Sequence, residues 1–215
     1  VKGTVFAIAI GPDESMWVGT SDGLFRFRDA YPDEHYTSAN SQLPAGNVYE
    51  IFFDSEGRGW ICAEGGRAVW NGSSLQADRF PEGFANELKI RDICETADGY
   101  LYFAPDRGPV FKSNMALTSF GFLPDFSTSG STATTFITQD DDHNLWFGTE
   151  KGLLMEDGKG RLHWFNNVDG LPDIVFTLCP PVTDSDGNMW IGNAHGLVKL
   201  DKLRLKSSLV GLHRA

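Results

Sequence analysis

A repeat of 42 to 44 residues constrains this chain more than any other feature of its sequence. Five aromatic side chains recur at intervals of 43, 42, 44 and 44 residues, and a glycine stands six residues after each of them. The aromatics are Trp17, Trp60, Tyr102, Trp146 and Trp190, and the glycines are Gly23, Gly66, Gly108, Gly152 and Gly196. The chain is therefore expected to repeat one small structural unit five times.

The residues around each aromatic predict four short strands per repeat. Apolar runs such as 5–10 and 48–53 predict a first strand that is buried on both faces. A turn containing an acid and a glycine follows, as in 54–60, and an acid stands four residues before each of the five aromatics. The aromatic lies on the second strand, and the glycine six residues later begins the third. A weaker outer strand is expected near Tyr36 and at 75–80, 117–120 and 162–165.

Four-stranded units at this period are typical of β-propeller blades, so we predict an all-β fold of five four-stranded antiparallel blades. We expect a single domain that covers residues 1–215. Its blades are expected at about 1–43, 44–86, 87–129, 130–171 and 172–215. We favour a closed five-bladed ring, and the alternative is part of a larger ring with, for example, seven blades. Pro180 and Pro181 predict an irregular inner strand in the fifth blade, and 203–212 is a candidate for its outer strand.

Charge and composition exclude several classes of partner. The formal net charge of −11 opposes binding to nucleic acid or to anionic lipid surfaces. No apolar run approaches the roughly 20 residues that span a bilayer, so we expect no direct membrane insertion by this segment. The chain begins at Val1, and we expect any signal peptide, anchor or output domain to lie outside it. Cys62, Cys94 and Cys179 form no CxxC pair and are interpreted as small buried strand residues.

The segment 170–200, with its echoes at 17–27 and 145–155, resembles the two-component regulator propeller repeat family. Repeats two and three depart from the family's core, reading WICAEGGRAV and YFAPDRGPV. The resemblance implies a non-catalytic sensor region, periplasmic or otherwise extracytoplasmic, of a bacterial hybrid two-component histidine kinase. It further implies a small polar ligand such as an oligosaccharide, a covalently linked kinase module outside this segment, and no cofactor. A homodimer remains open.

Candidate ligand-binding residues come from the loops between the second and third strands, which meet on one face of a propeller. The alternative for these positions is an ordinary solvated turn. The residues next to the repeat glycines that we select are Asp22, Glu64, Arg107, Glu150, Lys151 and His195.

Two further classes of function are kept as alternatives, although we predict no catalytic residue. A propeller enzyme could be a glycoside hydrolase using Glu50, Asp92 and Glu95, or could resemble streptogramin lyases and use His195 with Glu150. A lectin-like or purely scaffolding ring is the other. Trp70 or Trp164 could stack on a sugar if exposed, but packing between blades is the commoner fate of such side chains. The chain has no HExxH, GxSxG or phosphate-binding glycine motif.

The segments 140–144 and 184–188 resemble the opening of a calcium loop. Neither is followed by the glutamate that such a loop needs, and a capped hairpin turn explains the same residues. We therefore predict no metal site. The NGS segment that begins at Asn71 is likewise interpreted as a turn rather than a glycosylation acceptor.

Overall fold

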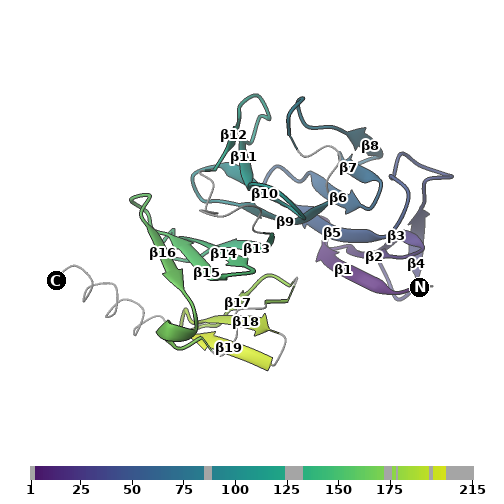
Figure 1. Cartoon of the computed structure of the whole chain (residues 1–215). Coiled ribbons are helices and arrows are strands. Elements are labelled where there is room, and N and C mark those ends of the chain that lie inside the picture. The colour runs from purple at the N-terminus through teal and green to yellow at the C-terminus, as the bar shows by residue number, and fades with distance from the viewer. Residues whose placement is uncertain are drawn as a thin grey trace. The chain divides into compact units, whose positions relative to one another are not determined.

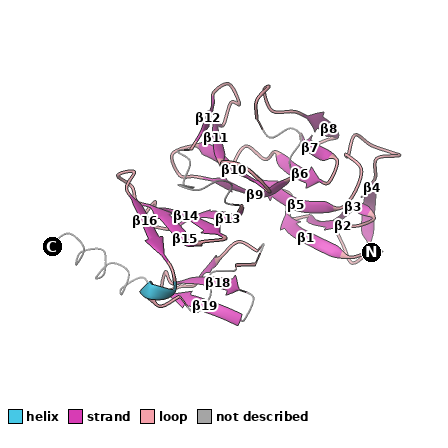
Figure 2. Ribbon diagram, viewed as in Figure 1, coloured by secondary structure: helices cyan, strands magenta, loops and turns pink. Residues whose placement is uncertain are grey.

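The computed structural model describes residues 3–84, 89–123, 133–171, 176–177, 179–193 and 196–201. Within them the chain is all-β, with five antiparallel sheets and one short 3₁₀ helix at Asn167–Asp169 (Figures 1 and 2). The predicted fold class, antiparallel blades of the β-propeller type, is confirmed. The chain divides into two compact units, 1–95 and 96–215, which are described separately below.

The first unit contains two complete blades and the first strand of a third. Blade one has the strand order β1-β2-β3-β4, and blade two has the order β5-β6-β7-β8. The strands are β1 (Val5–Ile10), β2 (Met16–Thr20), β3 (Gly23–Phe27), β4 (Pro32–Tyr36), β5 (Val48–Phe53), β6 (Gly59–Ala63), β7 (Gly66–Trp70), β8 (Leu75–Asp78) and β9 (Ile90–Glu95).

The second unit continues the same pattern. The third sheet has the order β12-β11-β10-β9, blade four has the order β13-β14-β15-β16, and blade five has three described strands in the order β17-β18-β19. These strands are β10 (Tyr100–Pro105), β11 (Phe111–Asn114), β12 (Phe120–Phe122), β13 (Thr134–Gln139), β14 (Leu145–Thr149), β15 (Gly152–Glu156), β16 (Leu162–Phe165), β17 (Val182–Thr183), β18 (Met189–Asn193) and β19 (Gly196–Leu200).

The repeated aromatic packs one blade onto the next, as predicted. In the first unit Trp17 is fully buried in a cluster with Ile51 and Trp70 of blade two, and the Trp17 and Trp70 ring centroids lie 5.1 Å apart. A side chain at Gly19 would meet Val48 of blade two, so only glycine allows this close approach. In the second unit Trp146 of blade four packs with Ile191 and Val198 of blade five.

An aspartate six residues before the aromatic, rather than the acid four residues before it, organises the inner turn. In blade two one carboxylate oxygen of Asp54 accepts hydrogen bonds from the backbone N–H groups of Glu56 and Arg58. The other oxygen accepts the indole N–H of Trp60 at 2.9 Å. Asp140 and Asp184 repeat this arrangement with Trp146 and Trp190, at 2.8 and 2.9 Å. The turn and the packing aromatic are thus fixed by the same side chain.

A hydrogen bond also joins the inner turn of one blade to the inner strand of the next. The backbone N–H of Ser55 donates to the carboxylate of Glu95 at 2.7 Å, and at the equivalent positions the N–H of Ala97 donates to the side-chain oxygen of Gln139 at 2.8 Å. Between blades one and two the equivalent pair is Pro12 and Phe53. Proline has no N–H and phenylalanine has no acceptor, so donor and acceptor are lost together. We call this hydrogen bond the inter-blade turn contact.

Several strand predictions need correction, and most of them concern blade three. Its outer strand is Phe120–Phe122 rather than 117–120, because Leu117 has a positive φ of 55° and lies in the preceding turn. Its third strand begins at Phe111, three residues after Gly108, because Pro109 cannot donate a ladder hydrogen bond. In blade two the outer strand ends at Asp78 rather than at residue 80.

Burial at the two ends of the described chain also differs from the prediction. Strand β1 was expected to be buried on both faces, yet Ile8 and Ile10 are 63% and 62% exposed, while Ala7 and Ala9 pack against the cluster around Trp17. Cys62 and Cys94 are buried in strands as predicted, but Cys179 is exposed and outside any strand. The irregular inner strand of blade five is confirmed, since β17 has two residues and Phe176 adds one isolated bridge. The candidate outer strand at 203–212 lies outside the described residues.

Candidate functional site

Five of the six predicted loop residues lie where the sequence placed them. Asp22 follows β2, Glu64 follows β6, Arg107 follows β10, and Glu150 and Lys151 follow β14. All five are exposed, and the Glu64 carboxylate forms an ion pair with Lys89 at 2.9 Å. Blades one to four therefore each present at least one charged side chain at this loop. His195 lies outside the described residues.

A threonine at the end of the second strand builds this loop in blades one and four. The hydroxyl of Thr20 donates to the carbonyl of Gly23 and accepts the N–H of Asp22. Thr149 makes the same two hydrogen bonds with Gly152 and Lys151. The buried threonine hydroxyl thus forms hydrogen bonds with one carbonyl and one N–H group of the turn. Asp22 and Lys151 lie on these short, hydrogen-bonded turns.

The inner-strand carboxylates separate into a pair and a single group. Burial, together with the negative charge of Asp92, raises the pKa of Glu50 well above its usual range. Glu50 lies on β5 and Asp92, which is 2% exposed, lies at the equivalent position of the neighbouring inner strand β9. Glu95 is occupied elsewhere, because its carboxylate accepts hydrogen bonds from the N–H and hydroxyl of Ser55. The structure thus brings together two of the three carboxylates named from the sequence.

A row of polar side chains crosses the whole sheet of blade two beginning at Glu50. Directly opposed positions on the four strands are Glu50, Cys62, Arg67 and Asp78, which we call the polar row. The same row is apolar in the other two complete blades where it is described: Ala7, Gly19, Leu24 and Tyr36 in blade one, and Phe136, Gly148, Leu153 and Phe165 in blade four. The sequence WICAEGGR, in which repeat two differs from the other repeats, therefore belongs to a row that is polar in blade two and apolar in blades one and four.

Arg67 is the cation of the polar row and is almost entirely buried. Its Nε donates to Asp78 at 3.0 Å, and its guanidinium lies 3.2 Å from the ring centroid of Phe80. One terminal nitrogen has no hydrogen-bond partner among the described residues. Burial lowers the pKa of Arg67 and raises that of the Cys62 thiol beside it, so Cys62 is held as an unreactive thiol.

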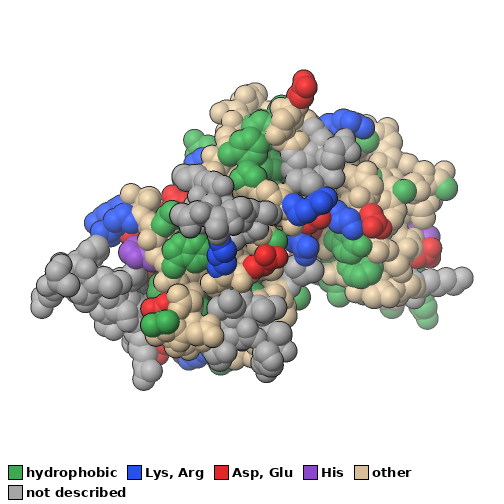
Figure 3. Space-filling view, in the orientation of Figure 1, with side chains coloured by type: hydrophobic (Ala, Val, Ile, Leu, Met, Phe, Trp, Pro, Cys, Tyr) green, Lys and Arg blue, Asp and Glu red, His purple; other side chains and the backbone are tan. Residues whose placement is uncertain are grey.

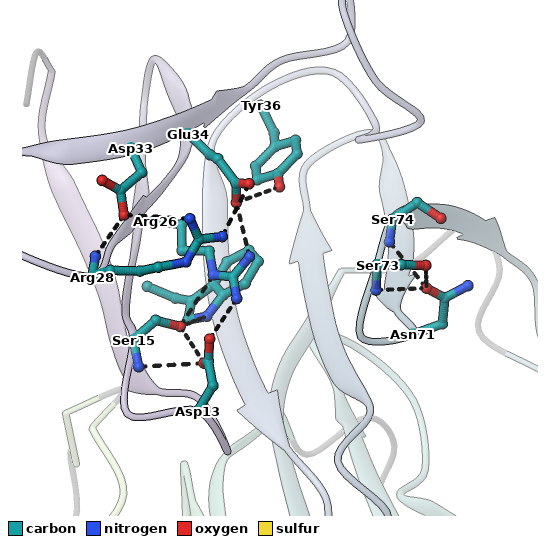
Figure 4. Close-up of polar contacts among 11 residues, drawn as sticks. Asp13, Ser15, Arg26, Arg28, Asp33, Glu34, Tyr36, Asn71, Ser73 and Ser74 are labelled. Atoms are coloured by element: carbon teal, nitrogen blue, oxygen red, sulfur yellow. Dashed lines mark hydrogen bonds and ion pairs between the residues drawn. The ribbon is translucent and has the colours of Figure 1, made fainter.

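Blade one carries a second buried cation in a different setting (Figure 4). Arg26 lies between Asp13 and Glu34, at 2.6 and 2.9 Å, and its guanidinium is about 5 Å from the ring centroids of Trp17 and Trp70. Ser15 accepts the indole N–H of Trp17 because the position six residues before this aromatic is Gly11. This network replaces the Asp–Trp hydrogen bond of blades two, four and five, and it packs the Arg26 guanidinium against two buried indoles.

The two segments that resemble calcium loops are hairpin turns. Asp140 and Asp184 use both carboxylate oxygens for backbone, asparagine and indole donors. Among the residues that the structure describes, no group of three or more His, Cys, Asp and Glu side chains is placed to hold a metal ion.

The residues considered for sugar stacking and glycosylation are placed as follows. Trp70 is buried against Trp17 of blade one, which is the packing between blades that we favoured, so it is not available to stack on a sugar, whereas Trp164 is 37% exposed. The side-chain oxygen of Asn71 accepts hydrogen bonds from the N–H groups of Ser73 and Ser74, as a turn requires (Figure 4). The face drawn in Figure 3 carries Lys, Arg, Asp and Glu side chains together with hydrophobic ones.

No described helix has the length and apolar character to cross a membrane. The fold and these loops define the class of the molecule: a chain of β-propeller blades that presents charged residues from the loops between the second and third strands of blades one to four.

Comparison with solved structures gives the same class of fold. The extracellular domain of BT3049 from B. thetaiotaomicron, which is assigned to a hybrid two-component system, matches 95% of this chain with a TM-score of 0.80 and 22% identity. The extracellular domain of BT4673 from the same organism matches 91% with a TM-score of 0.76 and 16% identity. The chain spans 28% and 27% of the lengths of these two extracellular domains.

Propellers of another kind are also similar. A catalytically inactive virginiamycin B lyase from Staphylococcus aureus, solved with quinupristin, matches 94% of this chain and 68% of its own length, with a TM-score of 0.67 and 15% identity. A scan against models of protein families gives no match, and a search of curated proteins gives none.

Proposed function

We propose that this chain is a ligand-sensing β-propeller segment of a bacterial extracytoplasmic signalling protein and that it does not catalyse a reaction. The observation that carries the proposal is the match of 95% of the chain, at a TM-score of 0.80, to the extracellular domain of BT3049. The ligand we propose is a small polar molecule such as an oligosaccharide. The signal would pass to a kinase module covalently linked outside this segment.

The loops after the second strands are the proposed contact surface. Asp22, Arg107, Glu150 and Lys151 are exposed on the equivalent short loops of blades one, three and four. Side chains of both signs offer donors and acceptors to hydroxyl groups, and hydrogen bonds to charged groups are the stronger ones in water. A ligand held by these loops would change a signalling equilibrium only by binding one arrangement of the protein more tightly than another.

Binding is tested by titrating the purified chain with a panel of defined gluco-, manno-, xylo- and galacturono-oligosaccharides, using calorimetry and tryptophan fluorescence. At least one oligosaccharide should bind saturably and be recovered intact by chromatography. Lys151→Ala should weaken that binding by about tenfold, because one charge-assisted hydrogen bond is lost. Lys159→Ala is the matched control, since Lys159 is an exposed lysine on the outer turn between β15 and β16. Equal losses in both variants, or no binding in the whole panel, would contradict the proposal.

A second candidate, a glycan-cleaving enzyme, is favoured by one observation: Glu50 has the raised pKa of a general acid and lies beside a second carboxylate. Under this alternative the panel would yield shorter products, and Glu50→Gln would abolish their formation. Intact oligosaccharides after prolonged incubation with the wild-type chain would remove this candidate.

A further inference from the structure

Two carboxylates, Glu50 and Asp92, lie on the neighbouring inner strands β5 and β9. These strands contact one another, and Glu50 and Asp92 occupy equivalent positions on them. Each carboxylate accepts the backbone N–H of the residue that follows it, Ile51 and Ile93 respectively. The two carboxylates therefore have the same local backbone setting on adjacent strands.

The surroundings of Glu50 contain little positive charge. Strands β1 and β2, which pack against β5, have no titratable side chain. Strand β6 contributes Cys62, and β9 contributes Asp92 together with Arg91 and Glu95. Neighbouring residues of a strand point to opposite faces, so Arg91 is directed away from the face of Asp92. Glu95 is bound to Ser55, and Arg67 is paired with Asp78 at the far side of the polar row.

Two carboxylates in this position repel one another when both are ionised. Burial and the negative charge of Asp92 both disfavour the ionised form of Glu50. One backbone N–H, that of Ile51, favours the ionised form. One proton held by the pair removes the repulsion, as in other sites where two carboxyls lie close together.

We propose that Glu50 and Asp92 form a proton-sharing contact between the inner strands of blades two and three, which stabilises the fold when the pair holds one proton and weakens it when both carboxyls are ionised. The contact makes the junction of β5 and β9 sensitive to pH. It is a property of the fold and does not depend on the ligand-sensing role.

The direction of the effect follows from the ionisation of Glu50. Its pKa is raised in the folded state, so the folded state holds a proton that the unfolded chain releases at about pH 4.3. The stabilisation is complete below that pH and is lost as the pH rises through the raised pKa. Across this window the folding equilibrium constant should fall by up to about tenfold per pH unit for one linked proton.

The first experiment uses the wild-type chain labelled with ¹³C at the side-chain carboxyl of glutamate. One carboxyl resonance, assigned to Glu50 by its disappearance in Glu50→Gln, should titrate at a higher pH than all the others. Titration of Glu50 together with the exposed glutamates would overturn the proposal, whether or not any variant folds well.

The second experiment measures the folding equilibrium constant by urea unfolding between about pH 4.5 and 8.5. Glu50→Gln keeps the shape of the neutral side chain and should abolish the pH-dependent decrease, so the variant becomes relatively more stable as the pH rises. Glu95→Gln is the matched control on β9, since Gln139 occupies the equivalent position of blade four. It should retain the wild-type pH dependence. If Glu50→Gln and Glu95→Gln change the pH dependence equally, the proton is not shared at Glu50 and Asp92.

Discussion

At the scale of single residues, the aspartate six residues before the packing aromatic of blades two, four and five does more than the sequence suggested. The acid four residues before the aromatic is present in all five repeats, whereas the aspartate two places earlier is present in only three, being replaced by Gly11 and Thr96. A count of matching columns therefore points to the acid four residues before the aromatic, which accepts hydrogen bonds from Ser15 in blade one, whereas the aspartate two places earlier holds the turn in blades two, four and five. The hydrogen bond from the indole N–H to the aspartate could have been anticipated only by asking what satisfies a buried indole.

Asp54 provides the test of this role. Its side chain is fully buried and accepts hydrogen bonds from two backbone N–H groups, the Arg58 guanidinium and Trp60. Asp54→Ala should lower the free energy of unfolding by about 2–4 kcal/mol, because several buried donors lose their acceptor. Glu56→Ala, which removes the acid four residues before Trp60, should cost less than about 1 kcal/mol, since that side chain is half exposed. Chemical denaturation of the two variants checks the difference, and equal losses would contradict it.

At the scale of strands, the sequence predicted most elements because the apolar runs and repeat glycines set their limits. Strands β1, β5 and β16 have the predicted bounds, and β3, β7, β15 and β19 each begin at the repeat glycine. Blade three was mispredicted where Pro109 interrupts the third strand. The polar row of blade two was also missed, because Glu50, Cys62, Arg67 and Asp78 are far apart in the sequence and become neighbours only through strand register.

The repeat glycines should differ in what they tolerate. Gly152 has φ of +126°, and a side chain there would collide with the carbonyl oxygen of Phe165, whereas Gly108 has φ of +89° and nothing within 4 Å. Gly108→Ala should cost about 1–2 kcal/mol from the left-handed backbone alone. Gly152→Ala should cost at least about 2 kcal/mol more, because backbone atoms must move. Thermal and urea unfolding of both variants measure the difference, and a larger loss for Gly108→Ala would be inconsistent with this geometry.

At the scale of the whole molecule, the carboxylates divide into two groups with opposite effects on stability. The hydrogen bond from Ser15, with help from Arg26, lowers the pKa of Asp13 to about 2, and the indole of Trp190 is the main cause that lowers the pKa of Asp184 to about 2. Glu50 is shifted in the other direction by burial and by Asp92. The net charge of −11 adds a general repulsion as the pH rises.

The stability of the chain should therefore be greatest in mildly acidic solution. The contributions of Asp13 and Asp184 are complete above the ordinary aspartate pKa of about 3.9 and are lost as the pH falls through about 2. The contribution of protonated Glu50 is lost as the pH rises above about 4.3 through its raised pKa. Urea unfolding at constant ionic strength from about pH 2 to 9 measures the free energy of unfolding. This free energy should be greatest at about pH 4, where the aspartate contributions are complete and Glu50 is still protonated. A stability that rises steadily to neutral pH would show that Glu50 ionises without cost.

The inter-blade turn contact also restricts how the repeats could be rearranged in a recombined gene. The first three junctions each have their own pair: Pro12 with Phe53, Ser55 with Glu95, and Ala97 with Gln139. If blade four were transplanted to follow blade one, Gln139 would face Pro12, which has no N–H to donate. If blade two were moved to follow blade three, the N–H of Ala97 would face Phe53 and lose its acceptor. The turn residue and the inner-strand residue thus favour the native order of the repeats. A duplicated or shuffled blade would need the N–H donor and the side-chain acceptor to be changed together.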